Sequence, residues 1–394
     1  MGIIAVSPRL LTPMRILFSS SPLTGHLLPM FPLAAAARRA GHEVVIAAGP
    51  DLRAGIERRG FTALAVGPTM AEISEFGLPR PPGPRAGDDE ILWNNVQRLF
   101  VNPSAARAPE LIRHTDRSPV DVVVQELYEI AATYVRPTTG RRFVHGLGAD
   151  FPGFVDLAIR GLAEVGRVVS RPAVARRYLA APYLDPFPPA LHAGGRPWRD
   201  VRPVRPDAGQ VPAGATLPDS FGRLPQPHTV YLTLGTVYSR AEAWKSLLEA
   251  VADLPVNVLA TIGNAVDPAE LGTLPANVAV ERYVPQSLLL PLCAAVICHA
   301  GAGTALGALA HGLPLVLLPM GADQFGNAAA IEAAGAGVAL DPQAATPNAI
   351  RAALGAVLDD ESYRRAARRV AESIAAMPSP DDVLADMLAG SPSE

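Results

Sequence analysis

The sequence predicts an α/β protein made of two doubly wound, Rossmann-like domains that face each other across a cleft. Short apolar segments alternate with helical patterns in two long runs, and a proline-rich stretch separates the runs. The length of 394 residues fits this arrangement, since a domain contains about 150 residues. Because hydrophobic residues make up 49% of the chain and charged residues only 18%, two large cores can form.

The first run begins with an apolar strand at residues 14–21, followed by a polar turn and an alanine-rich helix over about 30–40. The alternation of strand and helix predicts a parallel sheet, because parallel neighbours need a crossover between them. Further strands are expected at 42–48, 61–66, 120–127 and 141–148, with a helix at 51–60. Between 67 and 117 the sequence is irregular apart from one apolar helix, and we expect this insertion to shape a substrate pocket.

The second run starts with a strand at 229–237 and a helix that places Trp244, Leu247 and Val251 on one face. Further elements are expected as strands at 256–263, 277–284, 294–299 and 314–320 and as helices from 347 to 390. Eleven prolines between residues 181 and 227 indicate an extended connector. The predicted organisation is therefore a domain at 14–200, a linker at 201–227 and a domain at 228–394.

Composition argues against several classes of protein. With 34 Lys and Arg against 37 Asp and Glu, the net charge of −3 provides no broad basic surface for nucleic acid. The uncharged stretch from Tyr283 to Ala322 is broken by prolines and glycines, so it fits strands covered on both faces better than a membrane span. Only two cysteines are present, Cys293 and Cys298, which favours a reducing, cytoplasmic location.

A glycine-rich turn after the strand that ends at His299 predicts an anion site. The backbone N–H groups of Ala302, Gly303 and Thr304 would open a helix without intrahelical partners, and the helix dipole favours negative charge there. Gly301 and Gly303 carry no Cβ that would keep a ligand from the backbone. This site suits a phosphate.

The same glycines allow a second interpretation. Gly301, Gly303 and Gly307 approach a dinucleotide fingerprint, and Asp323 lies 20 residues beyond Gly303. This pattern favours an NAD(P)-dependent oxidoreductase. A fingerprint of this kind opens the first β-α-β unit of its domain, however, whereas here three strands precede it.

Five short motifs occur in order along the chain: GH at 25–26, TLGT at 233–236, RYVPQ at 282–286, HAGAGT at 299–304 and PMGADQFGNA at 319–328. Together they resemble the GT-B glycosyltransferases of family 1 that decorate macrolide and enediyne natural products with UDP- or dTDP-linked sugars. The resemblance runs from residue 14 to about 376. It implies a GT-B fold with the acceptor in the first half and the nucleotide sugar in the second, without a further cofactor and without a metal.

The resemblance also implies donor-binding roles in the second half. His299 and the turn after it would contact the diphosphate, the ring of Tyr283 would stack on the base and the backbone of Val284 would pair with its edge. Asp323 and Gln324 would bind the sugar hydroxyls. The complete implied donor set is Gly235, Thr236, Tyr283, Val284, Gln286, His299, Gly301, Ala302, Gly303, Thr304, Asp323 and Gln324.

One departure from the family pattern bears on the nucleotide. Relatives that use UDP often carry a glutamate eight residues after the motif histidine, where it holds the two ribose hydroxyls. That position is Gly307 here. Since a deoxyribose lacks the diol, the gap favours dTDP-sugars.

His26 is the candidate general base, since an imidazole can take a proton from an acceptor hydroxyl as it attacks the anomeric carbon. Glu126, at the end of a strand, resembles the acid that orients such a histidine, although Gln125 or Glu129 could fill the same place. The implied reaction is a single inverting displacement, with diphosphate as the leaving group. Asp88 lies in a run of three carboxylates that lacks a supporting histidine, and we predict no metal site there.

The aromatic residues Trp93, Phe100, Phe151 and Phe154 predict an apolar, bulky acceptor, and antibiotic biosynthesis is the expected setting. Two non-oxidoreductase alternatives remain at this point: a glycosyltransferase-like protein that binds or assists without catalysis, and a sugar-nucleotide epimerase. The expected partners are the aglycone and the nucleotide sugar, without nucleic acid or membrane. A homodimer is compatible with the sequence.

Overall fold

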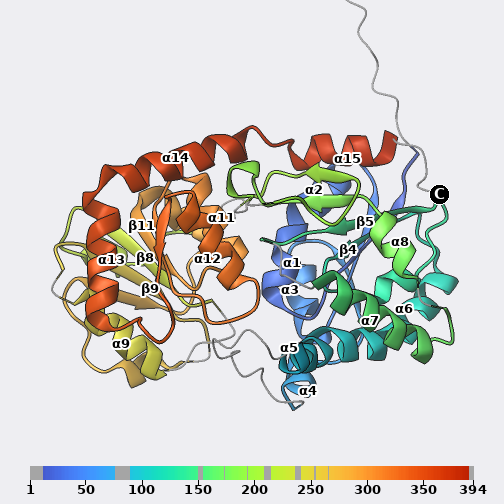
Figure 1. Ribbon diagram of the computed structural model, residues 1–394, viewed down its shortest axis with the longest axis horizontal. Coiled ribbons are helices and arrows are strands. Elements are labelled where there is room, and N and C mark those ends of the chain that lie inside the picture. The colour runs from blue at the N-terminus through green and yellow to red at the C-terminus, as the bar shows by residue number, and fades with distance from the viewer. Residues whose placement is uncertain are drawn as a thin grey trace, which may run out of the picture.

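The computed structural model describes residues 12–75, 89–149, 154–172, 174–192, 194–207, 214–235, 241–252, 254–264 and 266–389. Within them, two parallel sheets stand side by side, one in each half of the chain, and helices cover both faces of each sheet (Figure 1). The predicted pair of doubly wound domains is confirmed.

The first sheet has the strand order β3-β2-β1-β4-β5-β6-β7, and its neighbouring strands are parallel. Its strands are β1 (Arg15–Ser19), β2 (Glu43–Ala48), β3 (Thr62–Ala65), β4 (Val122–Glu126), β5 (Arg141–His145), β6 (Tyr183–Asp185) and β7 (Val201–Pro203). Its helices are α1 (Thr24–Leu27), α2 (Phe31–Arg39), α3 (Arg53–Arg58), α4 (Met70–Glu75), α5 (Asp89–Val96), α6 (Asn102–Arg117), α7 (Phe154–Val168) and α8 (Ala175–Ala180). The order reverses between β1 and β4, and ligands of open α/β sheets bind at such a switch point.

The second sheet repeats the plan with the order β10-β9-β8-β11-β12-β13. Its strands are β8 (Thr229–Thr233), β9 (Asn257–Thr261), β10 (Val278–Glu281), β11 (Cys293–Cys298), β12 (Leu315–Leu317) and β13 (Gly337–Ala339). Its helices are α9 (Ala241–Val251), α10 (Gln286–Leu289), α11 (Ala302–Ala310), α12 (Gln324–Ala333), α13 (Pro347–Asp359) and α14 (Glu361–Ala375). The switch point here lies between β8 and β11.

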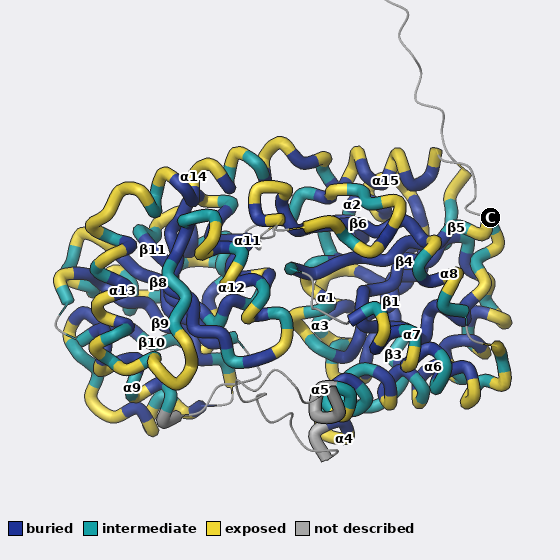
Figure 2. Tube along the Cα trace, in the orientation of Figure 1, coloured by how far each residue is buried: buried dark blue, intermediate teal, exposed yellow. Residues whose placement is uncertain are grey.

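The central strands are buried on both faces, which explains their continuous apolar runs. Every residue of β4, β8 and β9 is buried. Figure 2 shows these strands as buried segments inside each half, with exposed residues around the outside. Among the described residues, no helix combines the length and apolarity that a membrane crossing requires.

The insertion after β3 is more regular than its prolines and glycines indicated. From residue 89 to 117 the chain is helical, because α5 passes through a π-helical turn (Gln97–Val101) directly into α6. Ala108, Leu111 and Ile112 of α6 are buried, and this packing outweighs the presence of Pro109 inside the helix.

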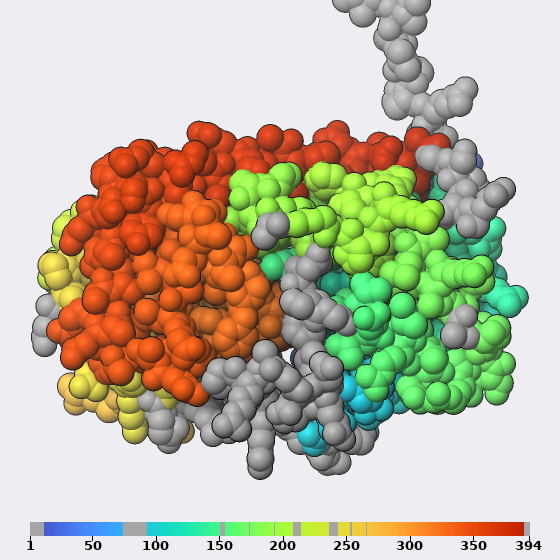
Figure 3. All heavy atoms as spheres, viewed as in Figure 1, coloured from blue at the N-terminus to red at the C-terminus, as the bar shows by residue number. Residues whose placement is uncertain are grey.

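The proline-rich connector also differs from the expected extended linker. Strands β6 and β7 extend the first sheet, and Pro203 is tolerated because β7 is an edge strand. Between these two strands, Phe187 and Leu191 pack into the core of the second half. In Figure 3 this light-green segment lies directly against the second half, so the two halves are already in contact before residue 200.

The last helix, α15 (Pro380–Ala389), returns to the first half, although the sequence placed it with the second. Its Val383, Leu384 and Met387 share a core cluster with Ile16 of β1, and α15 lies along α2 (Figure 1). The apolar period of this helix predicts that one face is buried but does not say against which core.

Candidate active site

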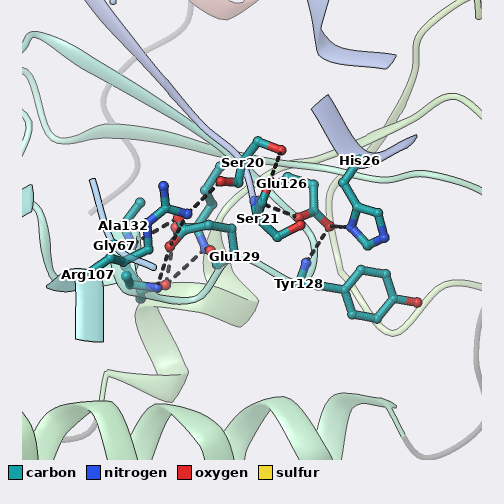
Figure 4. A network of polar contacts seen from close by, with 12 residues as sticks. Ser20, Ser21, His26, Gly67, Arg107, Glu126, Tyr128, Glu129 and Ala132 are labelled. Carbon is teal, nitrogen blue, oxygen red and sulfur yellow. Dashed lines mark hydrogen bonds and ion pairs between the residues drawn. The ribbon is translucent and has the colours of Figure 1, made fainter. Parts of the chain in front are cut away.

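The switch point of the first sheet brings His26 and Glu126 together. His26 belongs to α1, directly after β1, while Glu126 ends the neighbouring strand β4. His26 Nδ1 lies 3.1 Å from Glu126 Oε1, and the glutamate side chain is completely buried. Because Nδ1 faces the glutamate, Nε2 is the nitrogen left for a substrate. Figure 4 shows this pair with the residues that hold it.

Backbone amides fix the carboxylate of Glu126. The N–H of Tyr128 donates to Oε1 at 2.7 Å, and the N–H of Ser21 is directed to Oε2 at 3.4 Å. Deeper in the same network, the buried guanidinium of Arg107 donates to the carbonyl of Ser20 at 2.5 Å (Figure 4). Arg107 of α6 therefore holds the backbone at Ser20, just before the turn that carries His26.

The two other candidates for the partner of His26 face elsewhere. The carboxamide of Gln125 donates to Thr133 Oγ1 at 3.0 Å and accepts from Arg142 at 2.9 Å. Glu129 accepts from two backbone amides at the start of the next turn, at 3.0 and 3.2 Å, and lies 3.6 Å from Arg107. Of the three acids and amides considered from the sequence, only Glu126 lies against the imidazole.

Electrostatics favour the charged form of His26. Burial opposes a positive imidazole, but the negative charge and the contact of Glu126, together with the more distant Asp323, outweigh burial and raise the pKa of His26 above its ordinary value of 6.5. Asp323 comes from the second half, so groups from both halves of the chain lie within electrostatic range of each other.

An aromatic cluster lines the site next to His26. The imidazole ring lies 5.5 Å from the ring of Phe100 and 5.3 Å from that of Tyr128, measured between centroids. Tyr128 in turn contacts Phe154 at 4.5 Å. Of the predicted acceptor residues, Phe100 and Phe154 belong to this cluster. Trp93 instead packs at the edge of the core, with the guanidinium carbon of Arg160 3.9 Å from the centroid of its ring.

In the second half, His299 follows β11 and packs between two glycines. A Cβ on Gly235, whose φ is +71°, would lie 2.6 Å from the His299 ring, and a Cβ on Gly301 would overlap Nε2. Both glycines are therefore needed to seat the imidazole. Burial lowers the pKa of His299 to about 4, so the ring is neutral at physiological pH.

The turn after His299 opens α11 as expected. The first intrahelical bond runs from the N–H of Ala305 to the carbonyl of Gly301 at 3.0 Å, which leaves three earlier N–H groups at the helix start. A Cβ on Gly303 would meet no protein atom within 4 Å. Open space therefore lies in front of Gly303, where the helix dipole favours an anion.

Of the remaining donor candidates, Gln286 contacts this helix start directly. The ring of Tyr283 is 73% exposed and free to stack on a base, while Val284 is buried. The carboxamide nitrogen of Gln286 donates to Thr304 Oγ1 at 3.0 Å, so Gln286 positions that hydroxyl. Thr236 and Phe151 lie outside the described residues.

Asp323 and Gln324 differ in their availability to a sugar. Asp323 lies near His26 and its pKa is raised, because burial outweighs the lowering effects of His26 and of the hydrogen bond from Asn327. The side-chain oxygen of Gln324 instead accepts from the backbone amides of Met320 at 2.8 Å and Gly321 at 3.2 Å. The carboxamide oxygen of Gln324 therefore holds the loop before α12, and the predicted role of Gln324 in binding the sugar stays a prediction.

Sequence reasoning missed three residues of this site: Arg107, Tyr128 and Asn327. Tyr128 follows Glu126 by two residues, and that proximity was an available signal. Arg107 lies in the insertion whose sequence is irregular, so it left no local signal. Asn327 lies within the motif at 319–328, but that motif does not show its contact with the other half of the chain.

Three comparisons with known proteins show which chains this one is similar to. Residues 245–389 match the family described as erythromycin biosynthesis protein CIII-like, C-terminal domain. The aclacinomycin-T 2-deoxy-L-fucose transferase of Streptomyces galilaeus is 30% identical over 94% of each chain. The L-demethylnoviosyl transferase of Streptomyces niveus is 31% identical over 93% of this chain and 96% of its own.

A solved structure, that of the spinosyn rhamnosyltransferase SpnG, superimposes with a TM-score of 0.77 and 28% identity over 95% of this chain and 100% of that chain. The same enzyme has been solved with thymidine diphosphate and with the spinosyn aglycone. The relatives named here are transferases, and β11 is the fourth strand of its run rather than the first. The glycine-rich turn therefore belongs to a transferase and not to an oxidoreductase. The chain is a member of the GT-B glycosyltransferases of antibiotic biosynthesis.

Proposed function

We propose that the protein transfers a deoxysugar from a dTDP-sugar to a hydroxyl group of an apolar natural-product aglycone, with inversion at the anomeric carbon. The observation that carries the proposal is the approach of His26 and Glu126 from the first half to Asp323 from the second. A base for the acceptor and a ligand for the sugar thus meet in one cleft.

In the proposed reaction, the acceptor hydroxyl attacks the anomeric carbon and gives its proton to His26 Nε2. The bond between the acceptor oxygen and the anomeric carbon forms as the bond from that carbon to the diphosphate oxygen breaks, which inverts the configuration. Glu126 holds the imidazole through Nδ1 and stabilises the imidazolium that results. Asp323 binds the sugar hydroxyls.

The departing diphosphate would lie against the start of α11. Backbone N–H groups before Ala305 and the dipole of the helix would stabilise its charge. The low pKa of His299 makes this ring a neutral hydrogen-bond donor in the unliganded protein. We propose that these groups suffice without a metal ion.

Two observations favour dTDP over UDP. Gly307 is buried on α11, one helical turn beyond Gly303 and on the same face, and it offers no carboxylate for a ribose diol. A relative with the same fold, SpnG, has been solved with thymidine diphosphate.

For the acceptor, the aromatic cluster of Phe100, Tyr128 and Phe154 supports an apolar aglycone.

The experiment combines binding and product analysis. Calorimetric titration with dTDP and UDP at one salt concentration should show dTDP binding at least about tenfold more tightly, or about 1.4 kcal/mol. A panel of dTDP-deoxysugars and hydroxylated polyketide acceptors should then give a glycoside whose anomeric configuration, measured by NMR, is opposite to that of the donor. UDP preference would refute the nucleotide assignment, retention would refute the single displacement, and loss of activity with a chelator would refute metal independence.

A further inference from the structure

The side chain of Asn327 connects three segments of the protein where its two halves are in contact. Its Oδ1 accepts the N–H of Ala149 at 2.7 Å, while its Nδ2 donates to the carbonyl of Ala300 at 2.9 Å and to Asp323 Oδ2 at 3.0 Å. The residue is completely buried. Both donor hydrogens and the acceptor oxygen of the carboxamide are therefore engaged. We call Asn327, its partners Ala149, Ala300 and Asp323, and the neighbouring Gly148 the Asn327 clamp.

The three partners have different roles in the proposed reaction. Ala149 follows β5 and belongs to the acceptor half. Ala300 lies between His299 and the start of α11, and it adopts a left-handed φ of +62° that is uncommon for a residue other than glycine. Asp323 is the proposed sugar ligand that also influences His26. One side chain thus connects both halves to the two parts of the donor site.

Close packing completes the clamp. A Cβ on Gly148 would lie 2.5 Å from Asn327 Oδ1 and 2.9 Å from the Cβ of Ala302. The carbonyl of Gly148 accepts from Arg196 at 3.1 Å, and Arg196 forms two bonds of 2.7 and 2.9 Å with Asp185 at the end of β6. The loop at Gly148 is therefore held by its own half while it presses on the other.

We propose that Asn327 is a positioning residue that links the closure of the two halves to the orientation of Asp323 and the diphosphate turn. This inference rests on the proposed function. When the halves separate, the bond from Ala149 breaks and a buried carboxamide oxygen loses its partner, which is unfavourable unless the side chain turns. When the halves meet, Ala149 fixes the carboxamide, and Nδ2 then directs the carboxylate of Asp323 and the carbonyl of Ala300.

The test uses two variants. Gly148→Ala inserts a methyl group between the two halves and removes no polar group. Asn327→Leu removes all three hydrogen bonds of the side chain at similar volume. Gly195→Ala is the matched control, because its Cβ would meet no atom within 4 Å. We expect Gly148→Ala to lose at least tenfold in kcat and to bind dTDP more weakly than wild type, because the added methyl group presses on Asn327 and on Ala302 in the diphosphate turn. Asn327→Leu should also lose at least tenfold in kcat.

Small-angle scattering of the dTDP complexes provides a readout that does not depend on activity. Both variants should show a larger radius of gyration than wild type and the Gly195→Ala control. Wild-type kcat and scattering in Gly148→Ala would overturn the proposal, even if Asn327→Leu failed to fold. If wild type itself transferred no sugar, the proposed function would fail, whereas the scattering would still decide whether the clamp controls closure.

Discussion

Acidification should destabilise the protein through His299, and a nucleotide should counteract this effect. The imidazole is half-buried and neutral, with a pKa of about 4 in the folded protein against an ordinary value of 6.5. Between these two values the unfolded chain binds a proton that the folded chain does not bind. The free energy of unfolding therefore falls as the pH drops from 6.5 to 4.

The size of the effect follows from the two pKa values. Their difference of about 2.5 corresponds to about 3.4 kcal/mol once the pH lies well below 4. Between pH 7 and pH 5, His299 alone should lower the free energy of unfolding by about 2 kcal/mol. His145, at the end of β5, is buried and likewise has a pKa of about 4, so it should contribute a similar amount.

Urea unfolding of wild type, His299→Gln and His145→Gln at pH 7, 6 and 5 measures both terms. Each substitution should remove about 2 kcal/mol of the loss on acidification. Added dTDP separates the two histidines, because a diphosphate beside His299 would raise its pKa. Stabilisation by dTDP should therefore grow as the pH falls in wild type and His145→Gln but not in His299→Gln. An unfolding profile of His299→Gln that parallels wild type from pH 7 to 5 would refute the reasoning.

Three further predictions follow from the site. In Glu126→Gln the acid limb of kcat/KM should move to lower pH, because the carboxylate raises the pKa of His26; a limb at the wild-type position would contradict this. Tyr283→Ala should weaken dTDP binding by about tenfold or more, since stacking on a base contributes about 1–3 kcal/mol, and Tyr283→Phe should bind normally by calorimetry. Gly301→Ala should displace the His299 ring and weaken dTDP binding while His26 stays in place, and unchanged affinity would show that the ring position does not matter.

The strands and the order of the motifs could be predicted from the sequence because each depends on a local pattern. The apolar run of Val122, Val123 and Val124 predicts a buried strand, and the HAGAGT motif predicts a turn before a helix. The identity of the His26 partner could not be predicted in this way. Gln125, Glu126 and Glu129 all lie near the end of β4, and only the turn after the strand determines which side chain faces α1.

Features that depend on contacts between distant segments could not be predicted from local sequence patterns. The helical content of the insertion depends on burial of Leu111 against the first core, and the position of α15 depends on α2. Asn327 belongs to the motif at 319–328, but the motif does not show what this side chain contacts. Its importance emerges only when the loop at Ala149, 178 residues earlier in the chain, lies against it.

The most direct test of the account is the rate of sugar transfer by His26→Ala, measured under initial-rate conditions beside its affinity for dTDP. Because positioned proton transfer contributes about 10²–10⁴-fold, kcat should fall by at least about 100-fold. The affinity for dTDP should stay within threefold of wild type, since the nucleotide is assigned to the second half. A variant that retains the wild-type transfer rate would contradict the assignment of His26 as the base.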